Sequence, residues 1–145
     1  MSDSFLDHLP SHEREKIRKR IRSPEEYERL RDKVKGPEDL EREMKKSEQM
    51  AEVKFRMETE PEFTERLHHR IMEDLDQRGL QAVLEGDISG DATRALENGN
   101  FTVNVEAHPQ TQEDALVVIP EGNVQDRMPV KPSQSEHYIQ SLLSV

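Results

Sequence analysis

The helical character of the chain is clearest in residues 61–79, which read PEFTERLHHRIMEDLDQRG. Four large apolar side chains recur there at strict i, i+4 spacing, which places them on one face of an α-helix: Phe63, Leu67, Ile71 and Leu75. Proline at the start and glycine at the end are typical helix boundaries. We therefore expect one helix with a single apolar face, ending at Gly79, where the apolar pattern changes to another face.

Three more helices are predicted upstream of Pro61. Ser11 is a candidate cap for the first, and the sequence Ser23-Pro24-Glu25-Glu26 is a capping box for the second. The third runs from Pro37 to about Met57, with one apolar stripe and a wider arc in its second half. The stripe consists of Leu40, Met44, Ala51 and Phe55, and the arc of Met50, Val53 and Met57. These narrow faces indicate an ordinary bundle core, and the alternative is an exposed seam that meets a partner.

Strand patterns follow the helices. Residues 101–107 (FTVNVEA) alternate apolar and polar side chains, and residues 115–119 (ALVVI) are a short β-branched run that ends at a proline. A short helix is expected over residues 91–97. Two strands are marginal in water, so they must pack on the helices or pair with strands of another chain.

The composition limits the size of the core. Of the 145 residues only 32% are hydrophobic and 36% are charged, with a formal net charge of −10. The sequence contains no cysteine, which excludes disulfides and thiolate chemistry. No apolar run approaches the ~20 residues of a membrane span, and the first residues do not resemble an export signal. We therefore expect a cytoplasmic protein without a membrane partner.

The charge is unevenly distributed along the chain. Residues 1–80 hold 18 basic and 21 acidic side chains, whereas residues 81–145 hold 3 and 10.

The predicted fold is mostly α (α+β), a small helical bundle or helical hairpins followed by a two-stranded β element and an extended C-terminal tail. The predicted division is a charged helical region over 1–86, a short helix with two strands over 87–120, and a flexible tail over 121–145.

The tail ends in an apolar segment, residues 138–145. Its aliphatic side chains follow i, i+3, i+4 spacing, so we expect it to dock on an apolar groove of its own chain or of a partner, a frayed terminus being the alternative. The predicted partner-binding residues are those of this segment and the wide arc: Tyr138, Ile139, Leu142, Leu143, Val145, Met50 and Met57.

A basic patch lies in residues 14–22, which read REKIRKRIR. Its cations are Arg14, Lys16, Arg18, Lys19, Arg20 and Arg22. Such a patch meets phosphates of nucleic acid or an acidic protein surface. Acidic side chains flank it on both sides, so a solvated, salt-bridged helix face is the simpler interpretation.

Catalytic and metal-binding patterns are weak. Glu65 and His68 have the i, i+3 spacing of di-iron bundles, but no second pair accompanies them. The sequence after Asp87 lacks the glycine and the final glutamate of a calcium loop. The sequence shows no phosphate-binding loop and no nucleophile motif. We therefore expect no enzyme, no metal and no cofactor.

The predicted function is a non-enzymatic interaction protein, an adaptor, scaffold or assembly subunit that binds a protein partner or a second copy of itself. The alternative is a regulator that contacts nucleic acid through residues 14–22. Salt dependence separates the two, because phosphate contacts weaken steeply with salt.

Overall fold

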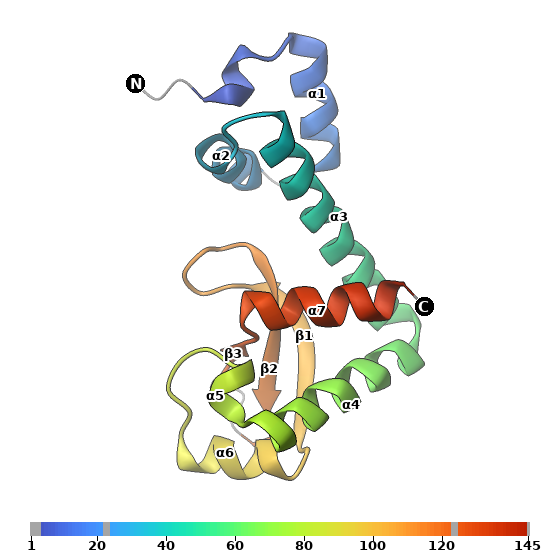
Figure 1. Cartoon of the computed structure of the whole chain (residues 1–145), viewed down its shortest axis with the longest axis vertical. Helices are drawn as coiled ribbons and strands as arrows, with labels where there is room; N and C mark the ends of the chain where they lie inside the picture. The colour runs from blue at the N-terminus through green and yellow to red at the C-terminus, as the bar shows by residue number, and fades with distance from the viewer. Residues whose placement is uncertain (1–3, 22–23, 123–124, 145) are drawn as a thin grey trace. The chain divides into compact units, whose positions relative to one another are not determined.

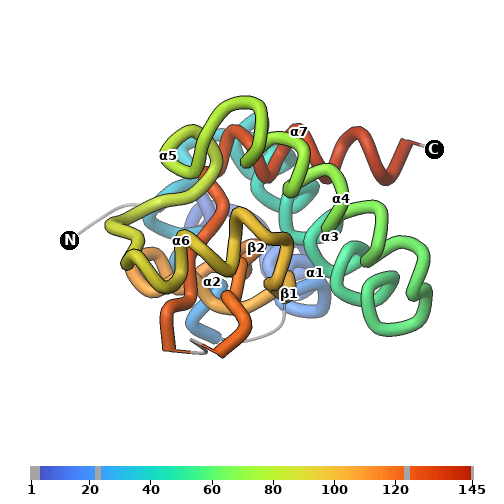
Figure 2. Tube along the Cα trace, turned by 90° about the horizontal axis from the view of Figure 1, so that it is seen from below, coloured from blue at the N-terminus to red at the C-terminus, as the bar shows by residue number. Residues whose placement is uncertain are grey.

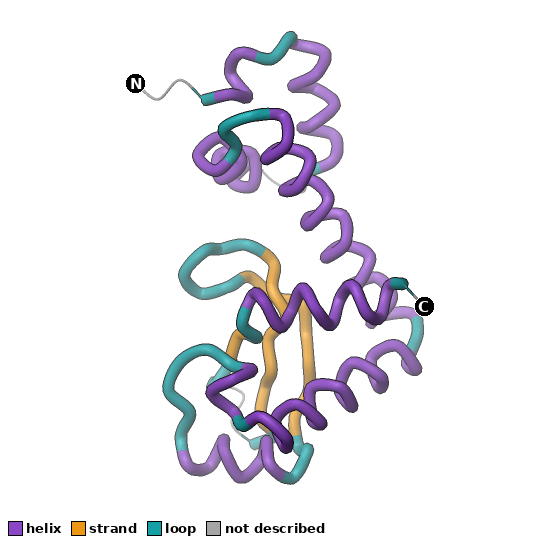
Figure 3. The backbone as a smooth tube through the Cα atoms, viewed as in Figure 1, coloured by secondary structure: helices purple, strands orange, loops and turns teal. Residues whose placement is uncertain are grey.

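The structure is a computed structural model that describes residues 4–21, 24–122 and 125–144. Within these residues it has seven α-helices, a short 3₁₀ helix and a three-stranded antiparallel sheet (Figure 3). The predicted mostly α fold with a small β element is confirmed. The sheet has one strand more than the sequence predicted.

The chain divides into two compact units, Met1–Gln49 (unit 1) and Met50–Val145 (unit 2), each with its own core. Unit 1 is helical. Its elements are η1 (Phe5–His8), α1 (Ser11–Arg20), α2 (Pro24–Lys33) and the first half of α3 (Pro37–Thr59). Its small core contains Leu6, Ile17, Tyr27, Leu30, Val34 and Met44. The capping residue predicted for α2, Ser23, lies outside the described residues.

Unit 2 combines helices with the sheet. After the end of α3 it contains α4 (Pro61–Arg78), α5 (Leu80–Val83), α6 (Gly90–Glu97), β1 (Phe101–Ala107), β2 (Asp114–Pro120), β3 (Met128–Pro129) and α7 (Pro132–Leu143). In Figures 1 and 2, α4 and α7 lie on the same face of the sheet. Alternate residues of β1 and β2, such as Val103 and its partner Val118, point to that face and join the core.

The third strand explains how the sheet is held at its far edge. β3 pairs with β2 through Val118 and Met128, and the Val130 N–H donates to the Leu116 carbonyl at 2.9 Å. The Glu85 N–H donates to the Pro129 carbonyl at 2.9 Å. A strand of two residues, one of them proline, is too short to show alternation, so its sequence carries no strand signal.

The segment expected as a flexible tail is largely ordered. It contains β3 and α7, and α7 begins at Pro132, six residues before the apolar segment. Tyr138, Ile139 and Leu142 are buried in the core of unit 2. Burial against α4 and the sheet stabilises a helix that would be marginal alone.

The division into units also differs from the predicted boundary at residue 86. The apolar face of α4 packs in the same core as the strands, so α4 and the sheet cannot belong to different domains. The change in composition near residue 80 is mainly a drop in the number of charged residues, and it does not mark a boundary between cores. Core membership depends on contacts that are distant in the sequence.

The apolar stripe predicted for α3 is not a continuous buried face. Met44 belongs to the core of unit 1 and Val53 to the core of unit 2. Phe55 is 64% exposed and Ala51 is also exposed. The second half of α3 therefore buries the wide arc around Val53 in place of the stripe.

Candidate functional site

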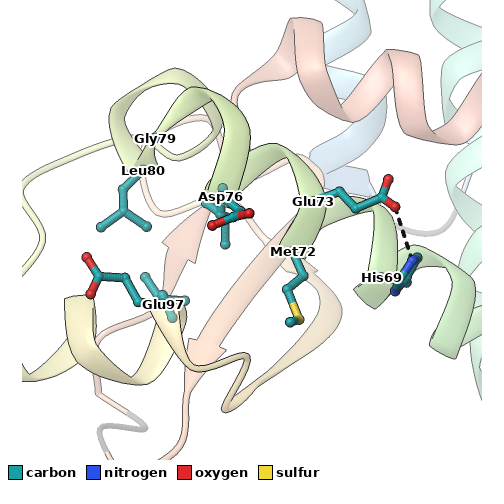
Figure 4. A pocket seen from close by; sticks show the side chains of 9 residues that line it. His69, Met72, Glu73, Asp76, Gly79, Leu80 and Glu97 are labelled. Carbon is teal, nitrogen blue, oxygen red and sulfur yellow. Dashed lines mark ion pairs between the residues drawn. The ribbon is translucent and has the colours of Figure 1, made fainter.

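Unit 2 has a pocket of about 640 Å³ between α4, α5 and α6, here called the α4–α6 pocket (Figure 4). Its lining combines apolar side chains with carboxylates. The lining residues are His69, Met72, Glu73, Leu75, Asp76, Gly79, Leu80, Leu96 and Glu97.

Helix geometry brings the α4 residues of this pocket together. His69, Met72, Glu73 and Asp76 stand at positions i, i+3, i+4 and i+7, so they share one side of the helix beside its buried apolar face. Gly79 ends α4 with a φ of 90°, a conformation that favours glycine, and the chain turns directly into α5.

Apolar side chains form the floor. Leu75 and Leu96 belong to the core of unit 2, and Leu80 packs against it from a partly exposed position. Met72 remains 38% exposed. A Cβ on Gly99, which has a φ of 75°, would approach the Met72 sulfur to 2.8 Å, so glycine at position 99 leaves room for this side chain.

Carboxylates surround the floor. Glu73 pairs with His69 at 3.2 Å between Oε1 and Nε2. Asp76 on α4 and Glu97 on α6 are exposed, and neither forms an ion pair with another described residue. In Figure 4 the side chains of Leu80, Asp76 and Glu97 extend toward the space between the helices, whereas Glu73 extends toward His69. The pocket is therefore apolar below and negatively charged at its mouth.

The sequence did not predict this pocket. Its carboxylates are three among 31 acidic residues, and no local spacing distinguishes them. Asp76 and Glu97 border the same pocket only because the chain turns at Gly79 and α6 packs against α4. One feature of the sequence could have indicated apolar surface at this site: Met72 lies outside the apolar face of its helix and is followed by two acidic residues.

The predicted partner-binding residues of the C-terminal segment lie inside unit 2. Tyr138, Ile139 and Leu142 are buried, and Leu143 is partly buried. Met50 and Met57 also pack against this core, while Val145 lies outside the described residues. The C-terminal segment was expected to dock on its own chain or on a partner, and in the structure it packs on its own unit. A partner could reach the buried side chains only if α7 detached.

One polar contact fixes α7 to α4. The Tyr138 hydroxyl donates a hydrogen bond of 2.6 Å to Asp74 Oδ2. Burial, and then the hydrogen bond and charge of Asp74, raise the pKa of the Tyr138 phenol above its ordinary value.

The basic patch of unit 1 is partly paired within that unit. Three of its cations contact acidic side chains: Lys16 with Glu13, Arg18 with Glu15, and Arg20 with Glu48. Arg18 also lies over the Tyr27 ring, 5.0 Å from its centroid. Arg14 donates to Ser11, Lys19 is exposed, and Arg22 lies outside the described residues. This arrangement matches a salt-bridged helix face better than a surface open to phosphates.

A second pocket, of about 620 Å³, adjoins this patch in unit 1 and includes Arg31. Arg31 donates to Asp7 at 2.8 and 3.1 Å and to Glu28 at 3.0 Å. The hydrogen bond from Arg31 lowers the pKa of the Asp7 carboxyl. Carboxylates therefore occupy Arg31, and of the two other arginines that line this pocket Arg18 pairs with Glu15 and Arg14 donates to the Ser11 hydroxyl.

Two histidines of unit 2, His68 and His108, form contacts that hold the backbone or a loop in place. His68 Nε2 lies 3.1 Å from the Gly99 carbonyl, and its ring stacks on Phe101 at 4.1 Å. His108 is buried, with Nδ1 accepting from the N–H groups of Gln110 and Thr111 and Nε2 2.7 Å from Glu85. Both ring nitrogens of His108 are thus used to hold the β1–β2 loop. Among the described residues there is no cluster of three or more potential metal ligands.

None of the described helices is both long and apolar enough to cross a membrane. The sequence matches no protein-family model, and no curated protein or solved structure shows significant similarity to it. Function is therefore inferred from the site itself.

Proposed function

We propose that this protein is a non-enzymatic interaction protein, an adaptor, scaffold or assembly subunit, that binds another protein through the α4–α6 pocket of unit 2. The observation that carries the proposal is the apolar floor of this pocket, with Met72 exposed, beneath two carboxylates, those of Asp76 and Glu97, that form no ion pair on the described part of the chain. Apolar centres with polar rims are typical of protein interfaces.

The distribution of charge between the units supports a protein partner for unit 2. Residues 1–49 hold thirteen basic and thirteen acidic side chains, and residues 50–145 hold eight and eighteen. The whole formal charge of −10 therefore belongs to unit 2. A surface of one sign attracts partners of the opposite sign and accelerates their association.

A point substitution tests the proposal better than removal of residues 121–145, because truncation would remove β3 and α7 from the core. Asp76→Lys reverses one charge at the pocket mouth, and Asp87→Lys, at an exposed position outside the pocket, is the matched control. Affinity capture from the native cell is expected to retain a partner with the wild type and with Asp87→Lys, and to lose it with Asp76→Lys.

Capture of the same proteins in the same amounts by all three forms would contradict the proposal. Loss of the partner with both substitutions would show that net charge, and not the pocket, directs binding. Self-association and a cytoplasmic location remain predictions. Light scattering and microscopy of the tagged protein test them.

A further inference from the structure

The two walls of the α4–α6 pocket each present a carboxylate that forms no ion pair with a described residue. Asp76 stands on α4 and Glu97 on α6, and the lone basic lining side chain, His69, is already paired with Glu73. Like charges at one pocket repel each other, and a cation placed between them removes that repulsion. The pocket mouth therefore favours a positively charged group.

The floor below these carboxylates is apolar and partly open to solvent. Met72, on the α4 side of the pocket, is 38% exposed, and Leu80, on α5, is partly buried. A long basic side chain covers apolar surface with its methylene groups while its charged end stays at the surface. Methionine adapts its shape to such a neighbour.

We infer that the α4–α6 pocket holds an arginine side chain from a positively charged segment of the partner protein, an inference that rests on the proposed function. The arginine stem lies on Met72 and Leu80, and the guanidinium lies between Asp76 and Glu97. Arginine fits better than lysine, because its planar group has five donors and is more weakly hydrated, so that it bonds two carboxylates at once.

The probe is a short acetylated and amidated peptide with an Arg-Leu-Arg centre in a Gly/Ser background. A second peptide carries citrulline, the neutral analogue of arginine, at both arginine positions. The methyl resonance of Met72 in the full-length protein is followed during titration at about 0.15 M salt, where charges are screened over about 8 Å. The arginine peptide is expected to shift this resonance saturably, and the citrulline peptide is expected to leave it in place.

Two double variants with equal loss of charge locate the binding site. Asp76→Asn/Glu97→Gln removes the carboxylates of the pocket, and Asp87→Asn/Glu136→Gln removes two exposed carboxylates elsewhere in unit 2. The first is expected to weaken binding of the arginine peptide at least about tenfold, and the second less than about threefold. All four positions are exposed, and unchanged core methyl resonances show that each variant is folded.

Absence of a shift with the arginine peptide, an equal shift with the citrulline peptide, or equal weakening in both variants would each overturn the inference. The result of the peptide titration can be distinguished from the result of the capture experiment that tests the proposed function. If Asp76→Lys loses a captured partner while the arginine peptide fails, the arginine assignment is wrong and the interaction function stands. If the pocket substitutions change neither the captured proteins nor the binding of the arginine peptide, the proposed function and the arginine assignment are both wrong.

Discussion

Gly99 shows how one residue without a side chain shapes the pocket. It adopts a φ of 75°, and any Cβ there would meet the Met72 sulfur at 2.8 Å. Left-handed backbone conformations are unfavourable for other residues. The backbone conformation therefore favours glycine at this position, and a Cβ there would also make the Met72 side chain shift.

Gly99→Ala is expected to lower the free energy of unfolding by about 1–3 kcal/mol, because it combines backbone strain with displacement of Met72. Gly90→Ala is the matched control, since position 90 has an ordinary φ and open space around its Cβ. Chemical denaturation measures both. Equal stability of the two variants would show that Met72 is not constrained by Gly99.

At the scale of elements, helices were the most predictable part of the fold. The face of α4 could be read from four residues at regular spacing, and prolines and glycines marked the ends of α3 and α4. β1 runs over the predicted residues 101–107 because one of its faces is buried and the other exposed. By contrast, the polar first turns of α7 carry no apolar pattern, and their helical form depends on packing of Tyr138 and Ile139 against unit 2.

The hydrogen bond between Tyr138 of α7 and Asp74 of α4 leads to a prediction at the same scale. Tyr138→Phe removes the hydrogen bond to Asp74 and is expected to lower the free energy of unfolding by about 1.5–3 kcal/mol, the range for bonds to charged groups. The raised pKa also implies a pH dependence. The folded state keeps the Tyr138 proton when the unfolded chain, with an ordinary tyrosine pKa of about 10, has lost it.

Wild-type stability should therefore fall as the pH rises above about 10, and Tyr138→Phe should lack this part of the decline. Denaturation curves measured at a series of alkaline pH values for the two proteins test this expectation. Parallel curves across the whole alkaline range would mean that Tyr138 is not buried against Asp74.

At the scale of the whole molecule, the sequence indicated the mixture of helices and strands but not the units. The break in composition near residue 80 lies inside unit 2, because α4 contributes Leu67 and Ile71 to the core under the sheet. Which carboxylates stand beside apolar surface depends on that packing. The pocket, with Asp76 and Glu97 on separate helices, could therefore not be found from spacing along the chain.

The central claim is that a partner protein contacts unit 2 at the α4–α6 pocket. The most direct measurement places a photoreactive amino acid at position 72 in the pocket, or at the exposed position 136 on α7, and irradiates the native cell. The account predicts a covalent adduct with a partner protein at position 72 and little or none at position 136. Equal adducts at both positions, or an adduct at position 136 alone, would contradict it.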